Sequence, residues 1–187
     1  MADEVRAARA GDDVDAVVTA AFGHRGEVVA ALWRDLESSG RVLASLVVER
    51  DGRTVGHVGL SPAWVDARRE LVDVWLLSPL SVHPEHQGRG VGTALVAAAI
   101  EAAREGGAPL LFLEGDPGYY GPRGFRPADG LDLRPPTDRI PPPAFQVVRY
   151  AAAQDWMTGR VVYPDVWWRH DLAGLRDPEL ARIEEGL

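Results

Sequence analysis

Residues 80 to 93 read LSVHPEHQGRGVGT, in which an apolar strand end is followed by a polar loop and three alternating glycines. Gly88, Gly90 and Gly92 let the backbone turn tightly and approach a ligand without a Cβ atom in the way. A helical pattern begins directly afterwards, and the first N–H groups of a helix have no partner inside it and lie at its positive end. This arrangement predicts an anion site that fits a pyrophosphate, and Arg89 can add a charge-assisted contact.

Two other phosphate-binding patterns match this stretch poorly. A dinucleotide fingerprint needs Gly-x-Gly-x-x-Gly after the first strand, whereas these glycines alternate and lie in mid-chain. A Walker loop needs Gly-Lys-Ser/Thr, and the sequence contains no lysine. On this stretch alone, a glycine-rich turn that merely starts an ordinary helix stays open.

The residues after the glycines predict a strand–helix–strand crossover. A helix is expected over Gly90–Glu105, ended by Gly106-Gly107, and Leu110–Leu113 is apolar on both faces, as in a covered central strand. The strand that ends at Val82 and the strand that begins at Leu110 should therefore be parallel neighbours. The expected buried stripe of the helix consists of Val91, Leu95, Ala98, Ala99 and Ala102.

The remaining elements predict an α/β sandwich with a mixed sheet. Asp51-Gly52 is a strong hairpin signal, and Asp12 or Asp13 can cap the first helix. The other expected strands are Val5–Arg9, Val42–Arg50, Thr54–Trp64, Leu71–Val82 and, after a proline-rich extended connection, Phe145–Tyr150; the other helices are Val14–Phe22 and Gly26–Ser38.

Composition narrows the class of protein. The 187 residues, 46% of them hydrophobic, suit one globular domain. The chain has no cysteine, and all 20 basic residues are arginine, so thiolate and lysine chemistry are excluded. A net charge of −8 argues against a nucleic-acid partner. No apolar run approaches the roughly 20 residues of a membrane span and no signal core is visible, so we expect a cytoplasmic protein without a membrane partner.

The same stretch resembles motif A of the GNAT superfamily of N-acetyltransferases, Gln/Arg-x-x-Gly-x-Gly/Ala after Leu-x-Val-x-Pro. The matching residues are Leu80, Val82, Pro84, Gln87, Gly90 and Gly92. Tyr120-Gly-Pro-Arg-Gly-Phe125 resembles the family's Tyr-x-x-x-Gly-Phe element, and residues 115–120 with the proline-rich return resemble a YhbS-like bacterial branch. The element order over residues 4–150 agrees with the family.

The resemblance implies a GNAT-like α/β fold: a mixed, mostly antiparallel sheet with a central parallel, splayed strand pair and helices on both faces. Residues 1–150 would form the acetyltransferase domain, and residues 151–187 a C-terminal extension that packs on it. The extension lies outside the general superfamily pattern and holds three of the six tryptophans. Trp156, Trp167, Trp168 and Tyr163 suit core or homodimer packing, or a lid over the acceptor site.

The resemblance also implies acetyl-CoA as the co-substrate, held between the splayed strands Leu71–Val82 and Leu110–Glu114. Pro79 supports a splay independently, because a proline within a strand cannot donate to the ladder. The Leu80 N–H would polarise the thioester carbonyl and Val82 would hold the pantetheine. The expected cofactor-binding residues are Leu80, Ser81, Val82, Gln87, Gly88, Arg89, Gly90, Val91, Gly92, Thr93 and Tyr120.

The implied reaction is direct attack of an amine on the thioester in a ternary complex. Tyr120 would protonate the departing thiolate, and Glu114, which closes an apolar strand, is the favoured base. Asp73, His57, His83 and a water chain also stay open as the base. Ser81 is a rival nucleophile, but it lacks a recognisable Ser-His-Asp pattern. No metal is expected, because His83 and His86 have no evident third ligand.

Two other functions stay open. The fold also suits a non-catalytic acyl-CoA-binding regulatory module, and the glycine-rich loop alone would suit a nucleotide-binding module. The sequence does not identify the acceptor: small amines, antibiotics, amino acids and protein N-termini all remain candidates.

Overall fold

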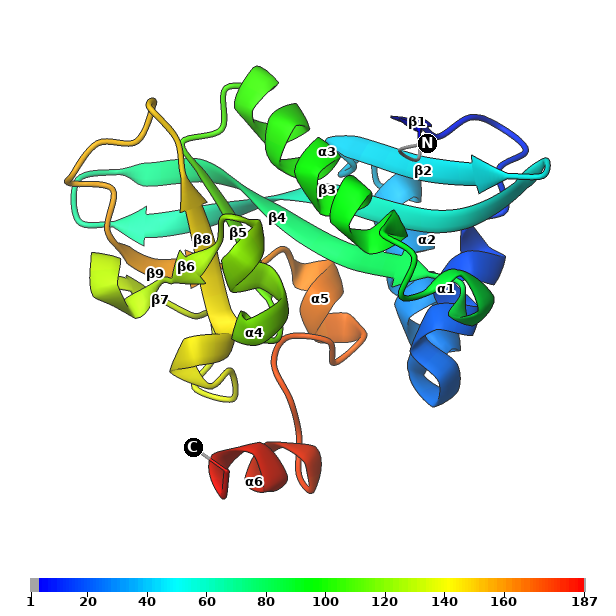
Figure 1. The fold of residues 1–187 in the computed structure, drawn as a ribbon. Helices are drawn as coiled ribbons and strands as arrows, with labels where there is room; N and C mark the ends of the chain where they lie inside the picture. The colour runs from blue at the N-terminus through cyan, green and yellow to red at the C-terminus, as the bar shows by residue number, and fades with distance from the viewer. Residues whose placement is uncertain (1–3, 187) are drawn as a thin grey trace. The chain divides into compact units, whose positions relative to one another are not determined.

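The computed structural model describes residues 4–186; residues 1–3 and 187, the outer ends of the two expected domain ranges, lie outside it (Figure 1). Six α-helices are assigned in this part of the chain: α1 Val14–Phe22, α2 Gly26–Ser38, α3 Val91–Glu105, α4 Pro117–Tyr120, α5 Asp165–Arg169 and α6 Glu179–Glu184. The strands are β1 Val5–Ala7, β2 Ala44–Arg50, β3 Arg53–Ala67, β4 Leu71–Val82, β5 Leu110–Glu114, β6 Arg126–Pro127, β7 Leu133–Arg134, β8 Phe145–Arg149 and β9 Gly159–Val162.

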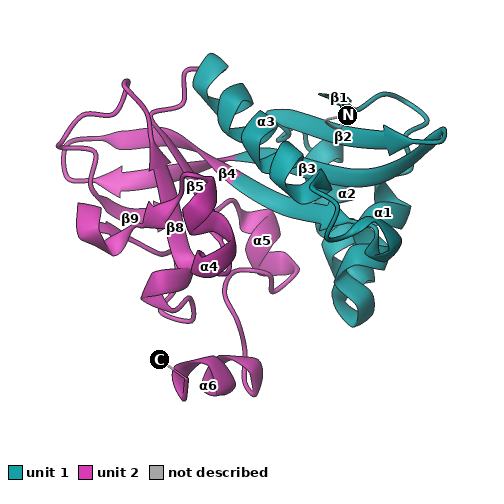
Figure 2. Ribbon diagram, viewed as in Figure 1, with its two compact units in different colours: residues 1–61, 77–106 teal, residues 62–76, 107–187 magenta. Residues whose placement is uncertain are grey.

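The chain divides into two compact units (Figure 2). Unit 1 contains residues up to 61 together with residues 77–106, and unit 2 contains residues 62–76 together with residues 107–187. The long strands β3 and β4 each contribute residues to both units. Residues 151–187, the expected C-terminal extension, belong to unit 2.

Unit 1 is a sheet covered by helices on both faces. β2 pairs antiparallel with β1 and with β3, and the predicted hairpin at Asp51-Gly52 is confirmed, with φ angles of 51° and 72°. A Cβ atom added to Gly59 would lie 2.2 Å from Trp33 Cζ3 of α2, and one added to Gly56 would lie 2.6 Å from Val91 Cγ1 of α3. Gly56 and Gly59 are three positions apart on β3, and successive residues of a strand point to alternate faces, so these two positions face opposite sides of the sheet. Helices α2 and α3 therefore cover opposite faces.

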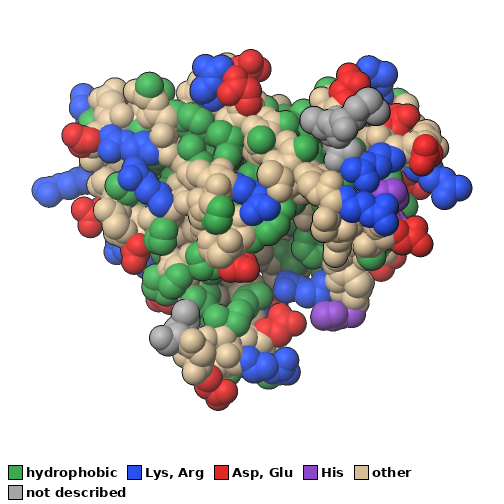
Figure 3. Space-filling model, viewed as in Figure 1, with side chains coloured by type: hydrophobic (Ala, Val, Ile, Leu, Met, Phe, Trp, Pro, Cys, Tyr) green, Lys and Arg blue, Asp and Glu red, His purple; other side chains and the backbone are tan. Residues whose placement is uncertain are grey.

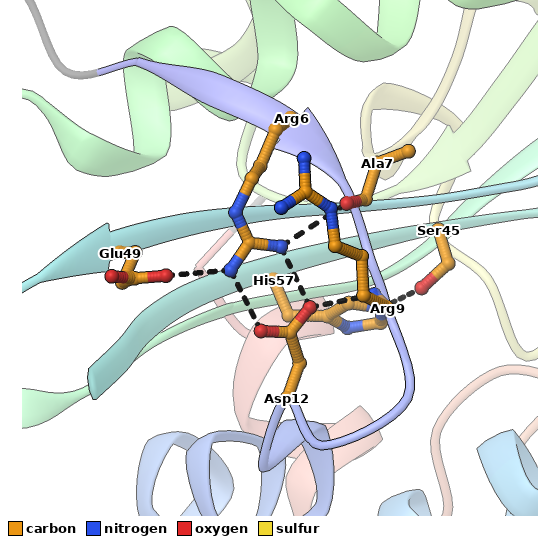
Figure 4. Close-up of polar contacts among 7 residues, drawn as sticks. All are labelled: Arg6, Ala7, Arg9, Asp12, Ser45, Glu49 and His57. Carbon is orange, nitrogen blue, oxygen red and sulfur yellow. Dashed lines mark hydrogen bonds and ion pairs between the residues drawn. The ribbon is translucent and has the colours of Figure 1, made fainter. Parts of the chain in front are cut away.

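A charged network fastens the edge of unit 1 (Figure 4). The Arg6 guanidinium donates to both carboxylate oxygens of Asp12, each at 2.7 Å, and to Glu49 Oε2 at 2.7 Å. The hydrogen bond from Arg6 lowers the pKa of Asp12 to about 2, against the opposing effect of burial. The network joins β1, the turn before α1 and β2, and it leaves Asp13 to cap α1 by accepting from Ala16 N at 3.0 Å.

Unit 2 contains the parallel strand pair. Trp75 and Leu76 of β4 pair with Leu111 and Phe112 of β5, which confirms the crossover prediction. β5 also pairs antiparallel with β8, and β8 pairs with β6. Residues 110–113 are fully buried, as expected of a strand covered on both faces. The mixed, mostly antiparallel sheet with helices around it confirms the predicted fold class.

The structure corrects two details. Gly159–Val162, expected to be part of an unassigned tail, forms β9, which pairs antiparallel with Trp64–Ala67 of β3 and parallel with β7. In α3, Val96 and Ala103 are buried, whereas Ala98 and Ala102 are half-buried. The buried positions Val91, Leu95, Ala99 and Ala103 follow a four-residue step, which displaces the buried stripe slightly from the one expected.

The surface carries charges of both signs. On the face shown in Figure 3, arginine and acidic side chains are interspersed rather than separated by sign. Within residues 4–186, none of the helices combines the length and the apolar character needed to cross a membrane.

Candidate active site

The loop after β4 is held by its own polar side chains. His83 N donates to Val55 O at 2.9 Å, and His83 Nδ1 accepts from Glu85 N at 3.4 Å. Gln87 Nε2 donates to Val82 O at 3.0 Å, so its side chain ties the loop to the end of the strand. His83 and Gln87 therefore shape the loop, a role that the sequence analysis did not assign to Gln87, which it placed among the cofactor-binding residues.

The loop ends in a cradle of positive-φ glycines. Gly88 has φ 70°, and Gly90, the N-cap of α3, has φ 89°. A Cβ atom added at either position would meet no heavy atom within 4 Å, so open space lies in front of both. The first helical hydrogen bond runs from Ala94 N to Gly90 O, and the N–H groups of Val91 and Gly92 precede it. A helix start of this kind is a typical binding site for a phosphate group.

Gly56 sets the depth at which α3 lies on the sheet of unit 1. A Cβ atom at Gly56 would approach Val91 Cγ1 to 2.6 Å and Leu95 Cδ1 to 2.9 Å. The absent side chain thus lets the first turns of α3 lie close to β3. Arg89 and Thr93, which the sequence predicts to bind the cofactor, are both exposed.

The last residues of β4 alternate between buried and half-buried. Leu80 and Val82 are half-buried, and the peptide bond before Pro79 is cis. Ser81 is fully buried, and its Oγ has no hydrogen-bond partner within the described residues. A serine nucleophile needs a hydrogen-bonded base, so the environment of Ser81 disfavours a covalent route.

A tight turn after β5 places the two tyrosines. Asp116 caps α4 by accepting from Gly118 N at 2.8 Å, and Gly124 adopts φ 101°, which favours glycine. Phe125 N then donates to Tyr120 O at 3.3 Å. The Tyr120 ring lies against Gly115, where a Cβ atom would be 2.3 Å from Cε2. Gly115 therefore makes room for this ring.

Tyr119 and Tyr120 lie in different environments. Burial raises the pKa of Tyr120 well above its usual value, with a smaller contribution from Tyr119, so its hydroxyl stays protonated. The Tyr119 ring is instead covered by the Arg123 guanidinium, 3.8 Å from its centroid. The two rings meet edge to face at 4.9 Å. Of the two tyrosines, Tyr120 is therefore the one whose pKa is raised by burial.

Glu114 ends β5 half-buried, and its Oε2 accepts from Gly174 N at 3.3 Å. Its ladder partner is Phe145, and directly opposed residues of an antiparallel pair share a face. Phe145 lines a cavity of about 740 Å³ together with Asp66, Arg68, Asp129, Asp132 and Arg134. Glu114 itself is not among the residues that line this cavity, which carries groups of both charges.

The other candidate bases are placed less favourably. His57 is fully buried, and burial lowers its pKa to about 3. Its Nε2 is 3.0 Å from Ser45 Oγ and its ring meets Trp33 edge-on at 4.8 Å, so it is a neutral core residue (Figure 4). Asp73 is exposed on β4.

The histidines of the loop do not form part of a larger ligand cluster. The rings of His83 and His86 are 6.1 Å apart. Between residues 4 and 186, no three His, Asp or Glu side chains are grouped so that they could hold a metal ion.

The parallel β4–β5 pair, and the crossover helix that begins at the glycine cradle, are the features that the resemblance to acyl-CoA-dependent acyltransferases implied. The chain belongs to the acetyltransferase (GNAT) family, whose model matches residues 15–121. This range includes the cradle and Tyr120.

Curated relatives agree with this assignment. The chain is 34% identical over 155 residues to YhbS of Escherichia coli, an uncharacterized N-acetyltransferase, covering 80% of this chain and 88% of YhbS. It is 37% identical over 120 residues to YjhQ of Escherichia coli (strain K12), covering 63% of this chain, and it spans only 65% of the length of YjhQ. The resemblance to a YhbS-like branch is confirmed.

Solved structures give the same result. Escherichia coli YhbS in complex with CoA superposes with a TM-score of 0.81 at 29% identity, over 94% of this chain and 97% of YhbS. A GNAT family acetyltransferase from Brucella melitensis in complex with acetyl-CoA gives a TM-score of 0.71 at 27% identity, over 88% and 97%.

Proposed function

We propose that the protein transfers an acetyl group from acetyl-CoA to an amine acceptor by direct attack in a ternary complex. The observation that carries the proposal is the cradle of Gly88 and Gly90 at the exposed start of α3, which offers open space at the positive end of a helix to a pyrophosphate. The CoA and acetyl-CoA complexes of the two structural relatives support the choice of co-substrate.

In this proposal the cofactor contacts come from two consecutive segments of the chain. The N–H groups of Val91, Gly92 and Thr93, together with Arg89 and the turn Gln87–Gly90, bind the pyrophosphate. Leu80, Ser81 and Val82 bind the pantetheine through their backbone, and the Leu80 N–H faces the thioester oxygen. A fixed N–H directed at a developing oxyanion lowers a barrier by typically about 3 kcal/mol.

The proton transfers are assigned to two residues of unit 2. Tyr120, which stays protonated because burial raises its pKa, gives its proton to the departing thiolate. Glu114 accepts a proton from the attacking amine. Acetyl-CoA supplies the acetyl group in activated form, so these residues need only to orient and to move protons.

We also propose that residues 151–187 are an integral part of the acetyltransferase domain rather than a separate module. β9 lies within the sheet of unit 2, and Gly174 contacts the end of β5.

The experiment is to measure release of free CoA thiol from acetyl-CoA against a panel of primary amines that includes alkylamines, amino acids, aminoglycosides and peptide N-termini. We expect turnover with at least one class. A protein that binds acetyl-CoA tightly but acetylates no member of the panel would instead be the non-catalytic regulatory module.

A further inference from the structure

The segment that follows β8 contacts the rest of unit 2 at two places. First, β9 pairs with both β3 and β7, and α5 follows it directly. Trp167 of α5 is 4% exposed and its ring lies 5.4 Å from that of Tyr163. Residues 159–175, here termed the C-terminal segment, are therefore packed into unit 2 rather than attached to its surface.

At the second place, a backbone N–H group of the segment contacts Glu114. Gly174 has φ 71°, and its N–H donates to Glu114 Oε2 across 60 residues of sequence. A Cβ atom here would lie 2.9 Å from Thr137 Cγ2 and 3.1 Å from Arg139 O. The next residue is fixed in turn, since Leu175 N donates to Arg139 O at 3.1 Å. Only glycine fits this position without displacing the N–H from the carboxylate.

Tyr163 carries a buried hydroxyl that has no hydrogen-bond partner within the described residues. Its side chain is 3% exposed, and burial followed by the nearby Glu114 raises its pKa well above the usual value. The hydroxyl forms no hydrogen bond of standard geometry within the described residues, although Glu114 is close enough to affect its ionisation. A buried hydroxyl without a regular partner costs stability, which suggests that it is retained for another reason.

We propose that Tyr163 and Gly174 of the C-terminal segment are positioning residues, which hold the Glu114 carboxylate in the orientation that accepts the proton of the acceptor amine. The inference rests on the proposed role of Glu114 as the base. Neither residue needs to touch the acceptor or acetyl-CoA. Fixed orientation matters because proton transfer requires hydrogen-bond distance between base and substrate.

Hydrogen exchange tests the contact without any turnover. In the wild-type protein we expect slow exchange of the Gly174 amide, and in Glu114→Ala we expect its protection to fall while that of the β9 amides is kept. Equal protection of Gly174 in both proteins would overturn the proposal. This result does not depend on the protein being an acetyltransferase.

Kinetics test the positioning role. The acceptors are an alkylamine selected from the panel, which is protonated at neutral pH, and hydroxylamine, which is largely neutral and needs no base to become nucleophilic. For Tyr163→Phe we expect kcat with the alkylamine to fall about tenfold, less than the roughly hundredfold or more of a lost acid–base group, because Glu114 is misoriented and not removed. The KM for acetyl-CoA should be unchanged and the melting temperature should not fall. The loss with hydroxylamine should be less than about threefold. An equal loss with both acceptors, or no loss, would contradict the positioning role.

Two glycine variants separate position from strain. Gly174→Ala should reproduce the acceptor-dependent loss, because the added Cβ displaces the N–H. Gly107→Ala is the matched control: its φ of 75° is almost the same, but its Cβ would meet nothing within 4 Å, so activity should change less than about twofold. Full alkylamine activity in Glu114→Gln would refute the base itself, whereas a defect in Glu114→Gln without one in Tyr163→Phe and Gly174→Ala would refute only the positioning role.

Discussion

At the scale of single residues, the proposed reaction assigns the proton of the departing thiolate to Tyr120 and not to the adjacent Tyr119. Tyr120→Phe should lower turnover about tenfold to a thousandfold, near the lower part of the range for lost acid catalysis, while acetyl-CoA affinity changes little. The reason is that the change removes one hydroxyl and leaves the ring against Gly115. Steady-state rates together with calorimetric acetyl-CoA binding measure the two effects.

Tyr119→Phe provides the control for this prediction. Its ring stays under Arg123, so both stability and rate should be close to wild type. A loss confined to Tyr119→Phe would move the assignment by one residue. Normal rates in both variants would assign the proton to water or to another group.

His57 gives a pH-dependent prediction. Its pKa is about 3 in the folded protein and about 6.5 when unfolded, so protonation favours the unfolded chain. Its contribution to stability is complete above pH 6.5 and is lost as the pH falls towards 3. Between neutral pH and about pH 4.5, the free energy of unfolding should fall by roughly 2–3 kcal/mol from this residue.

Denaturant unfolding of wild type and His57→Gln over this pH range isolates the effect. The variant should show a shallower decline between pH 6.5 and about pH 4.5, whatever its stability at neutral pH. The Asp12 carboxylate does not interfere, because its lowered pKa of about 2 confines its effect to more acidic conditions, below its ordinary value of 3.8. Parallel curves for the two proteins would show that His57 is not the buried neutral group.

At the scale of elements, we propose a binding role for the start of α3 in addition to its structural role. Gly92→Asp should lower acetyl-CoA affinity about a hundredfold, since like charges roughly 4 Å apart repel by a few kcal/mol. The fold should survive, because an acidic residue in the first turn favours the helix. Calorimetric titration with acetyl-CoA and a thermal melt give the two quantities.

Gly92→Asn has nearly the same shape without the charge and should bind much more tightly than Gly92→Asp. If the two variants bind equally, shape and not charge limits binding, and the pyrophosphate lies elsewhere. A Gly92→Asp protein with wild-type affinity would remove the cradle from the site altogether.

Elements with strong local signals could be predicted well from the sequence. The bounds of α1, α2 and β4 match the expected ones, because a cap, a helical apolar period or an alternating strand defines each locally. β9 could not be predicted, since its four residues have no such signal and it is stabilised by pairing with distant strands. The same holds for β6 and β7, of two residues each.

At the scale of the whole molecule, the cradle and the Tyr120 turn were recognisable because each is a contiguous motif. The surroundings of Glu114 were not, because they depend on contacts between residues far apart in the chain, such as that of Gly174. The cluster of aromatic residues in the tail was the available signal. It indicated burial, which Tyr163 and Trp167 show, but Trp168 is 44% exposed, and nothing in the pattern pointed to Glu114.

Binding of the co-substrate should stabilise the whole protein. At a concentration of acetyl-CoA about a hundred times its Kd, linkage adds roughly 2.7 kcal/mol to the free energy of unfolding. For a chain of this size, this corresponds to a rise in melting temperature of about 5–10 °C. Adenosine diphosphate should give a clearly smaller shift, because it offers the cradle a pyrophosphate but leaves the backbone of Leu80 and Val82 without a partner. Equal shifts would indicate a nucleotide-binding module, and no shift at millimolar acetyl-CoA would refute the proposed co-substrate.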